Sequence, residues 1–408
     1  MPQPLDGLLV VDFSHVMAGP FASHFLRMLG AEVVKIEAPG RGDLFRNYGA
    51  DRRYDGMSPA FIAANAGKES IALDLKAPDG LEVARRLIAK ADVLVENFRP
   101  GVMAKLGLDY ETCKALNPRL IYCSVSGYGQ AGPMRDYPAI DNVVQATSGM
   151  MSVNGEPDDP PSRVGVPVVD TYVGTLAALA ILAATVQRER FGDGQYIDVA
   201  MLDASVLLLI GAAVPYLVTG GTPPRTGNTG YSAQPTAGMF ETADGSMISL
   251  GVVQQNQFES LCKAMERLDL KEDPRFATLE ARTRPEYSTL LTAELRETFR
   301  RKPGDEWEAI LSRAGAPCGL VRTVGQACDL PQLDSRGLKL PVHIPGLPNE
   351  DVHVLNAGFV FAHGGPGIDR PPPRLGQHTA AVLRRAGYDE TEIQRLIADG
   401  VAVEAVAN

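Results

Sequence analysis

Roughly the first 130 residues alternate between short apolar runs rich in β-branched residues and longer segments with helical spacing of their apolar residues. Strands that alternate with helices indicate βαβ units, because parallel strands need a crossover connection, usually a helix. The pattern therefore predicts an α/β fold with a doubly wound, Rossmann-like parallel sheet. In such sheets ligands bind in the turns that follow the strands. The expected strands cover 8–14, 31–39, 92–98 and 120–129, and the expected helices cover 20–30, 79–91 and 109–118.

The pattern changes in the second half of the chain. An extended run at 164–169 leads into an Ala-rich helix, and a strand at 194–200 leads into a second buried helix. The segment "GTPPRTGNTGYSAQPTAG" that follows is a loop long enough to have a function or to bridge domains. Next come a hairpin that turns at Asp244-Gly245 and charged helical segments. We therefore expect a first part of a large domain at 1–224, a smaller α+β domain at 225–325, and a return to the large domain at 326–408.

Composition narrows the class of partner. The 408 residues are 45% hydrophobic, enough for a packed core, and the formal net charge is −10. This acidity argues against nucleic acid as a partner, because phosphate backbones attract basic proteins. The N-terminus lacks the basic region of a signal peptide, and no uncharged run reaches transmembrane length, so we expect no membrane anchor. Five scattered cysteines fit neither a disulfide framework nor a zinc pattern, which favours a cytoplasmic protein without a metal site.

Several familiar catalytic motifs are weak or missing. G-x-G-x-x-G occurs at Gly127, Gly129 and Gly132, but Pro133 interrupts the helix that a dinucleotide site requires, so we interpret it as a structural loop. The sequence has neither a G-x-S-x-G nucleophile elbow nor a P-loop, and none of its six histidines is spaced with another metal ligand. His15, at the end of the first strand, is the histidine best placed for a site.

Basic residues lie near the expected strand ends. Each one alone is explained as a solvated surface charge. As a set along one edge of a parallel sheet, they are candidates to hold a phosphorylated ligand. The backbone of residues 73–76, including Leu73 and Leu75, is a candidate to read an adenine by hydrogen bonds. The basic candidates are Lys35, Arg41, Lys68, Lys76, Arg99 and Lys105.

Asp170 stands where the extended run meets the Ala-rich helix, with no other charge until Arg188. One interpretation is a helix N-cap, for which aspartate is a favoured residue. The other interpretation is a catalytic carboxylate at the same position. A carboxylate at a helix N-terminus is stabilised as an anion and can act as a nucleophile that forms a covalent acyl intermediate. The residues alone leave both interpretations open.

Eight stretches, in order along nearly the whole chain, resemble the class III CoA-transferase family. This family includes formyl-CoA, carnitine and bile-acid CoA-transferases, with the α-methylacyl-CoA racemases as a branch. The stretches are "LDGLLVVDFSHVMAGPFASHFLRMLGAEVVKIEAPGRGD", "NAGKESIALDLKAPDG", "DVLVENFRPGVMAKLGLDYE", "NPRLIYCSVSGYGQAGP", "VGVPVVDTYVGTLAALAILAA", "GDGQYIDVAMLDASV", "GAPCGLV" and "RPPPRLGQHT".

The resemblance implies a role for Asp170 and a fold. Asp170 would be the nucleophile that forms an aspartyl anhydride and then an aspartyl-CoA thioester. Coenzyme A thioester would be a substrate, with no tightly bound cofactor. The large domain would contain both chain ends, and ring-shaped subunits would interlock in a dimer. Coenzyme A would contact Val16, Arg41, Leu73, Leu75, Lys76, Asn97, Arg99 and Lys105, and the lid and substrate site would use His15, Gly230, Tyr231 and Gln234.

Two departures from the family pattern bear on the reaction. The racemase branch has a histidine where this chain reads "YPAID" with Ala139, which disfavours proton exchange because that chemistry needs two poised acid–base groups. The lid sequence "GNTGYSAQP" has fewer glycines than that of formyl-CoA transferase, which favours a larger acid.

The resemblance leaves the substrate and the assembly open. We expect succinyl-CoA as donor and a dicarboxylate such as mesaconate, itaconate, citramalate, glutarate or benzylsuccinate as acceptor. Arg163, His15 or Arg46 would bind the second carboxylate. The alternatives are an acyl-CoA racemase, or an inactive partner subunit of a hetero-oligomeric transferase. The chain would form a homodimer, or a heterodimer or heterotetramer with a paralogue.

Overall fold

The computed structural model describes residues 2–49, 51–229 and 234–405, which form two compact units. The large unit comprises Met1–Met150, Arg163–Gly220 and Pro331–Asn408, and the small unit comprises Met151–Ser162 and Gly221–Leu330. The segment 151–162, which we expected in the large domain, belongs to the small unit. Hydrogen bonds explain this: Asn228 Nδ2 donates to Glu156 Oε1 at 2.7 Å, and Arg225 Nη1 donates to the backbone oxygen of Glu156 at 3.2 Å.

A seven-stranded sheet organises the large unit, with the order β12-β3-β2-β1-β4-β5-β6. Strands β1 to β6 are parallel, and β12 pairs antiparallel with β3. The order 3-2-1-4-5-6 reverses between β1 and β4, as in doubly wound nucleotide-binding sheets. The predicted parallel-sheet core is therefore confirmed. The strands are β1 (Leu9–Asp12), β2 (Glu32–Glu37), β3 (Glu69–Leu73), β4 (Val93–Glu96), β5 (Ile121–Ser126), β6 (Gln195–Ala200) and β12 (Ala402–Val403).

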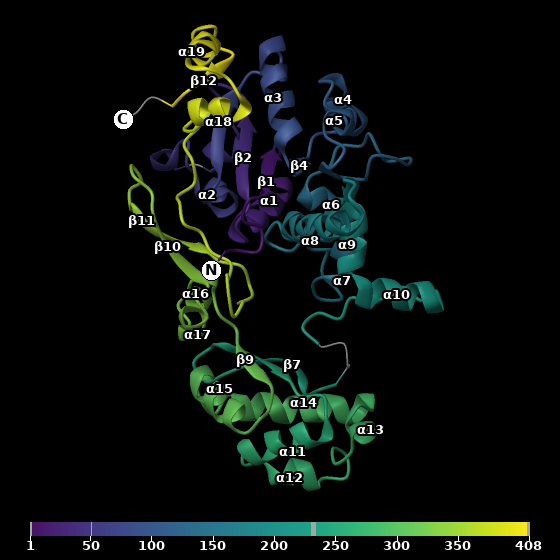
Figure 1. The fold of residues 1–408 in the computed structure, drawn as a ribbon. Helices are drawn as coiled ribbons and strands as arrows, with labels where there is room; N and C mark the ends of the chain where they lie inside the picture. Colours follow the sequence, from purple (N-terminus) through teal and green to yellow (C-terminus); the bar gives the residue numbers. More distant parts are fainter. Residues whose placement is uncertain (1, 50, 230–233, 406–408) are drawn as a thin grey trace. The chain divides into compact units, whose positions relative to one another are not determined.

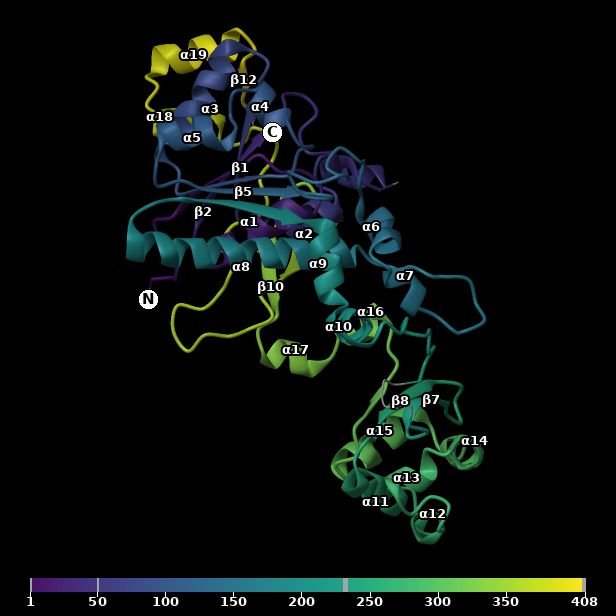
Figure 2. The same cartoon turned by 90° about the vertical axis from the view of Figure 1, so that its right-hand side faces the viewer.

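Helices cover both faces of this sheet, so its strands read as nearly continuous apolar runs. One face packs against α3, α5, α18 and α19, and the other against α1 and α8 (Figures 1 and 2). Smaller elements complete the unit, including an antiparallel pair of β10 (Lys339–His343) and β11 (Asp351–Leu355). The covering helices are α1 (Ala18–Met28), α3 (Pro78–Lys90), α5 (Tyr110–Leu116), α8 (Val168–Phe191), α18 (Thr379–Ala386) and α19 (Glu390–Ala398).

The three helices α8, α9 and α10 carry an unusual amount of exposed apolar surface. The second helix that we predicted to be buried is broken into α9 (Met201–Leu208) and α10 (Ile210–Thr219), which differ in direction by 83°. None of the α10 side chains is buried, so the prediction of burial is wrong there. Helix α8 has 24 residues, and an 18-residue stretch of it has a mean hydropathy of 1.7, so the helix is long and apolar enough for a membrane span. One face of α8 packs in the core beside α1, however, as expected for a core helix of an α/β layer.

The small unit has its own core. Strands β7 (Ala237–Glu241), β8 (Met247–Gly251) and β9 (Cys318–Leu320) form an antiparallel sheet, and the predicted hairpin at Asp244-Gly245 is confirmed. Gly245 has a φ of +78°, a conformation that favours glycine at such a turn. The predicted helical region packs on this sheet around Trp307. Its helices are α11 (Gln255–Ala264), α12 (Leu268–Glu272), α13 (Leu279–Arg282), α14 (Pro285–Phe299) and α15 (Gly304–Arg313).

Candidate active site

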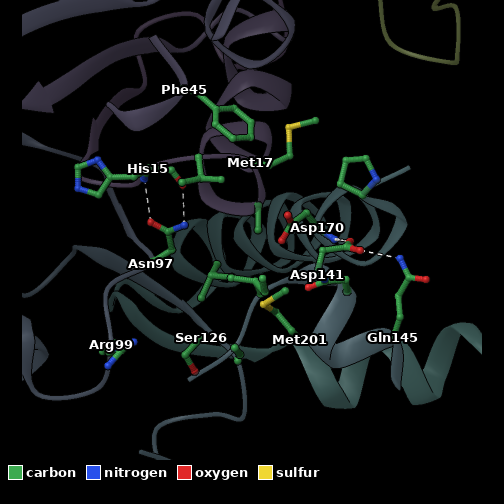
Figure 3. A pocket seen from close by; sticks show the side chains of 18 of the residues that line it. His15, Met17, Phe45, Asn97, Arg99, Ser126, Asp141, Gln145, Asp170 and Met201 are labelled. Atoms are coloured by element: carbon green, nitrogen blue, oxygen red, sulfur yellow. Dashed lines mark hydrogen bonds between the residues drawn. The ribbon is translucent and has the colours of Figure 1, made fainter. Parts of the chain in front are cut away.

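A cavity of about 800 Å³ opens in the large unit beside the carboxyl ends of β1 and β4, where the strand order reverses. Ligands of doubly wound sheets bind at such a point. Residues from the loops after β1, β4 and β5 line the cavity, together with the start of α8 (Figure 3). The cavity brings together six of the predicted site residues: Asp170, His15, Val16, Asn97, Arg99 and Arg163.

Asp170 does not cap its helix. Helix α8 begins at Val168, so Asp170 is its third residue, and the cap position is Pro167, which provides no side-chain hydrogen bond. Asp141 performs this role: its Oδ2 accepts from the backbone N–H of Val169 at 2.8 Å and from that of Asp170 at 3.0 Å. The N-cap interpretation of Asp170 is therefore wrong. The run before the helix forms no strand, because the helix starts earlier than its β-branched residues indicated.

The Asp170 carboxylate is left facing the cavity (Figure 3). Within the described residues it has no hydrogen-bond or ion-pair partner. Burial raises its pKa to about 7, and the nearby charge of Asp141 adds to the increase. A carboxylate with free lone pairs in a partly dehydrated cavity is suited to act as a nucleophile or a base.

Asp141 is itself held by Gln145, which lies on the same helix, α6 (Asp141–Thr147). Gln145 Nε2 donates to Asp141 Oδ1 at 2.6 Å, and Gln145 Oε1 accepts from the backbone N–H of Val164 at 2.9 Å. These bonds join α6 to the segment that leads into α8. Sequence reasoning missed Asp141 and Gln145, since no local signal indicates that an acid caps a helix 29 residues further along the chain.

The pH dependence of activity tests this arrangement. We expect kcat/KM to rise with pH through about 7, because the nucleophile acts as the carboxylate and its pKa in the free enzyme is about 7. Asp141→Asn removes a like charge, so the pKa of Asp170 should fall and the acid limb should move to lower pH. Asp136→Asn, in an exposed loop near the cavity, is the control that should leave the limb in place. An acid limb that stays at the same pH in Asp141→Asn would contradict the assigned coupling.

The loop after β1 forms a second wall of the cavity. Asn97, which follows β4, binds the backbone of this loop at His15. Its Oδ1 accepts from the His15 N–H and its Nδ2 donates to the His15 backbone oxygen, both at 2.8 Å (Figure 3). The His15 ring packs edge-on against Phe98, with ring centroids 5.0 Å apart. Burial and the Lys35 charge lower the pKa of His15, which favours a neutral ring and makes it a weak partner for a second carboxylate.

This loop leads into helix α1, whose first turn borders the cavity through Met17 and Ala18. The helix has no side-chain cap and no acidic residue in its first turn. The first N–H groups of a helix lack partners within the helix. They are therefore available to stabilise negative charge that develops on a bound carbonyl oxygen.

Three arginines line the cavity: Arg99, Arg135 and Arg163. All three side chains are exposed and have no ion-pair partner in the chain as described. Arg135 was missed from the sequence because the loop that carries it shows no regular pattern. Three cations around one cavity, without ion-pair partners among the described residues, suit a ligand with several negative charges.

Three other predicted ligand contacts are wrong, because the cations form buried ion pairs with acidic residues of the same chain. Lys35 pairs with Asp43 at 2.9 Å, Lys68 with Asp12 at 3.0 Å and Arg46 with Glu37 at 2.6 Å. The six side chains are at most 2% exposed. Carboxylates buried at the strand ends need these cations, so Lys35 and Lys68 cannot reach a ligand phosphate and Arg46 cannot bind a substrate carboxylate.

The other predicted contacts lie elsewhere. Leu73 is buried in β3, and its neighbours Asp74 and Lys76 already donate their N–H groups within the chain, to Val401 O and Asp74 Oδ1. Gln234 is buried in the small unit and donates to Val253 O at 3.0 Å. Gly230 and Tyr231 lie outside the described residues. Outside the cavity lining are Arg41, Leu73, Leu75, Lys76 and Lys105.

Comparisons with known proteins show the family of the chain. The family model described as CoA-transferase family III matches residues 5–379. The succinate–glutarate CoA-transferase of Agrobacterium fabrum is 38% identical, over 93% of this chain and 95% of its own. The acetyl-CoA:oxalate CoA-transferase of Acetobacter aceti is also 38% identical, over 95% and 97%.

A solved structure gives the same result for the fold. The crystal structure of a CAIB/BAIF family protein from Brucella suis superimposes with a TM-score of 0.84 at 35% identity, covering 95% of this chain and all of that one. The match extends over both units of the chain. The chain therefore belongs to CoA-transferase family III and is a CoA-transferase.

Proposed function

We propose that this enzyme moves coenzyme A from succinyl-CoA to a dicarboxylic acid by covalent catalysis at Asp170. The observation that carries the proposal is the Asp170 carboxylate, which faces the cavity and has no partner among the described residues, while Asp141 caps its helix. A carboxylate that served only as a cap would accept hydrogen bonds from the helix N–H groups. Those N–H groups donate to Asp141 instead, so the Asp170 oxygens remain available for a substrate.

The proposed sequence conserves the thioester. An Asp170 oxygen attacks the donor thioester carbonyl, the C–S bond breaks, and a mixed anhydride and coenzyme A thiolate result. The thiolate then attacks the Asp170 carbonyl carbon, which expels succinate and leaves an aspartyl-CoA thioester. The acceptor carboxylate attacks this thioester and releases the thiolate, which finally attacks the acceptor's acyl carbon and restores Asp170. Each step exchanges one acyl bond for another, so no external proton or oxidant is required.

Charge develops on a carbonyl oxygen in each of these steps. The uncapped first turn of α1, at Met17 and Ala18, provides backbone donors at the cavity wall for that oxygen. Arg99 and Arg135, which follow β4 and β5, are suited to the phosphates of coenzyme A, since carboxyl ends of parallel strands bind phosphorylated ligands. Water must be excluded, because it would hydrolyse the anhydride.

Arg163 is the proposed partner for the second carboxylate of the acceptor. It lies on the segment that leads into α8, next to Val164, which Gln145 anchors. Gln145 therefore holds both the segment that carries Arg163 and Asp141, the residue that caps α8. Two relatives have names that specify glutarate and oxalate, both dicarboxylates, which agrees with a cation at this position.

Arg163→Leu tests this assignment. We expect KM for a dicarboxylate acceptor to rise by about 10- to 100-fold, because a charge-assisted hydrogen bond is lost. KM for succinyl-CoA should rise as well, since succinate carries the same free carboxylate, whereas KM for acetyl-CoA should change little. Steady-state kinetics with glutarate, oxalate, mesaconate and a monocarboxylate measure the effect. An equal increase in KM for mono- and dicarboxylates would contradict the role of Arg163.

We further propose that the chain functions as an interlocked dimer. Helices α8, α9 and α10 expose many large apolar side chains, and clustered exposed apolar surface of this kind marks interaction sites. We expect light scattering to give twice the chain mass of 43.7 kDa. Leu217→Glu combined with Val218→Glu should reduce the dimer fraction, whereas Glu111→Lys, at an exposed position of α5 on the other face of the sheet, should not. A monomeric wild-type chain would contradict the proposal. The exposed residues are Leu179, Val186, Phe191, Val206, Leu207, Leu208, Ile210, Val214, Tyr216, Leu217 and Val218.

A covalent trap tests the proposed function directly. Purified protein is incubated with succinyl-CoA and hydroxylamine, digested, and examined by mass spectrometry for a hydroxamate at Asp170. Modification that depends on acyl-CoA supports the aspartyl route. If no acyl-CoA gives modification, exchange of the α-proton in heavy water would favour a racemase instead. Neither modification nor exchange would favour an inactive partner subunit.

A further inference from the structure

Val16 adopts a backbone conformation that β-branched residues avoid. Its φ is +69°, in the left-handed region. Among the described residues, Glu266 is the other non-glycine residue with positive φ, and it comes just after Met265, the C-cap of α11, where left-handed residues are common. Val16 instead precedes a helix and lines the cavity. A conformation of this kind persists only where surrounding contacts enforce it.

Asp43 supplies one of these contacts. Its Oδ1 and Oδ2 lie 3.0 and 3.3 Å from the backbone nitrogen of Val16. The same carboxylate accepts from the N–H of Phe45 at 2.9 Å, and Phe45 also lines the cavity. One buried side chain thus joins two walls of the cavity, the loop after β1 and the short turn that carries Phe45.

Lys35 fixes Asp43 and the same loop. Its Nζ lies 2.9 Å from Asp43 Oδ2 and donates to the backbone oxygen of Ser14 at 2.6 Å. Asn97 holds His15, the residue between Ser14 and Val16, by hydrogen bonds to the backbone N–H and the backbone oxygen of His15. Three successive residues of the loop, Ser14, His15 and Val16, are therefore held by side chains from β2 and from the segments that follow β2 and β4.

We propose that Asp43 and Lys35 are positioning residues, which hold Val16 in its left-handed conformation so that the first turn of α1 faces the acyl-CoA thioester. The inference rests on the proposed function, because it assigns the loop a role in binding the thioester. Neither side chain reaches the cavity lining, so both act through Val16 and Phe45.

The test measures coupling between Asp43 and Val16. Asp43→Asn should lower kcat/KM by about 100-fold, since misplacement of a binding wall by an ångström has effects of this size. Glycine adopts positive φ without a steric cost, so in a Val16→Gly background the same change should lower kcat/KM by only about tenfold. Binding of coenzyme A, measured by calorimetry, should show the same pattern. Equal effects in both backgrounds would overturn the proposal.

Two further variants keep the test decisive. Asp43→Asn leaves Lys35 buried without its partner, so the double variant Asp43→Asn/Lys35→Met removes both charges in case the single variant is poorly folded. It should show the same coupling to Val16→Gly. Asp51→Asn is the matched control. Asp51 caps the next short turn through the N–H of Arg53, and its hydrogen bonds within the described residues do not involve the loop after β1. It should leave kcat/KM unchanged.

The readouts separate this inference from the proposed function. A wild-type enzyme that is inactive with succinyl-CoA and every dicarboxylate would argue against the proposed substrates, while coenzyme A binding would still report the coupling. An active wild type with additive effects of Asp43→Asn and Val16→Gly would leave the proposed function intact and refute the positioning role.

Discussion

Asp170→Asn is expected to lower kcat by about 10⁴-fold or more, while the protein remains folded and dimeric. An amide cannot form the anhydride or the aspartyl thioester, and losses of this size follow removal of a catalytic nucleophile. Asparagine keeps the shape of the side chain, so coenzyme A should still bind within a few-fold of the wild-type affinity. Transfer of coenzyme A, followed by chromatography of the thioesters, measures the loss, and calorimetry measures the binding.

Asp203→Asn is the matched control for this change. Asp203 is the third residue of α9, as Asp170 is of α8, but it is exposed and does not line the cavity. It should keep wild-type kcat within about twofold, since surface substitutions of this kind have small effects. An Asp170→Asn enzyme with more than about a tenth of wild-type activity would exclude covalent catalysis at this residue.

Lys68→Met is expected to lower the free energy of unfolding by about 3–5 kcal/mol, the cost of leaving a buried charge without its partner. Lys68 Nζ lies 3.0 Å from Asp12 Oδ2 and also donates to Ser23 Oγ at 2.8 Å and to the Pro20 oxygen at 2.9 Å. Methionine fills much of the same volume but provides no charge. Lys76→Met, at an exposed position in the turn after β3, should change stability by less than about 0.5 kcal/mol. Urea denaturation measures both variants.

The effect of Lys68→Met should depend on pH. Burial opposes ionisation of Asp12, but Lys68, Lys35 and the hydroxyls of Ser14 and Ser23 outweigh it and hold its pKa well below 3.8. In the wild type the stabilisation is present above pH 3.8 and is lost as the pH falls toward the lower, folded-state pKa. Without Lys68 the pKa of Asp12 rises, so the variant gains a proton at higher pH. The difference in stability should therefore narrow between pH 7 and pH 4, and a constant difference would contradict the ion pair.

The predicted elements were confirmed where local pattern decides them. The strands now seen as β1, β2, β4, β5 and β6, the hairpin at Asp244-Gly245 and the small unit's helices all follow from spacing of apolar residues and from turn chemistry. The predictions failed where burial on one face was at issue. Helix α10 is as apolar as a core helix, yet none of its side chains is buried. Apolar residues predict that a helix face is covered in the functional protein, but they do not tell whether the same chain covers it.

The sequence by itself determined the family, the parallel sheet and Asp170 as the acid to examine, because these depend on residues close together along the chain. Tertiary structure alone decided that Asp141 caps α8 and frees Asp170, and that Lys35, Lys68 and Arg46 are buried ion pairs. Whether a charge binds a ligand or a neighbour depends on what the folded chain places beside it. The order of the strands sets these neighbours, over distances of 29 residues for Asp141 and 56 for Lys68, which no local pattern records.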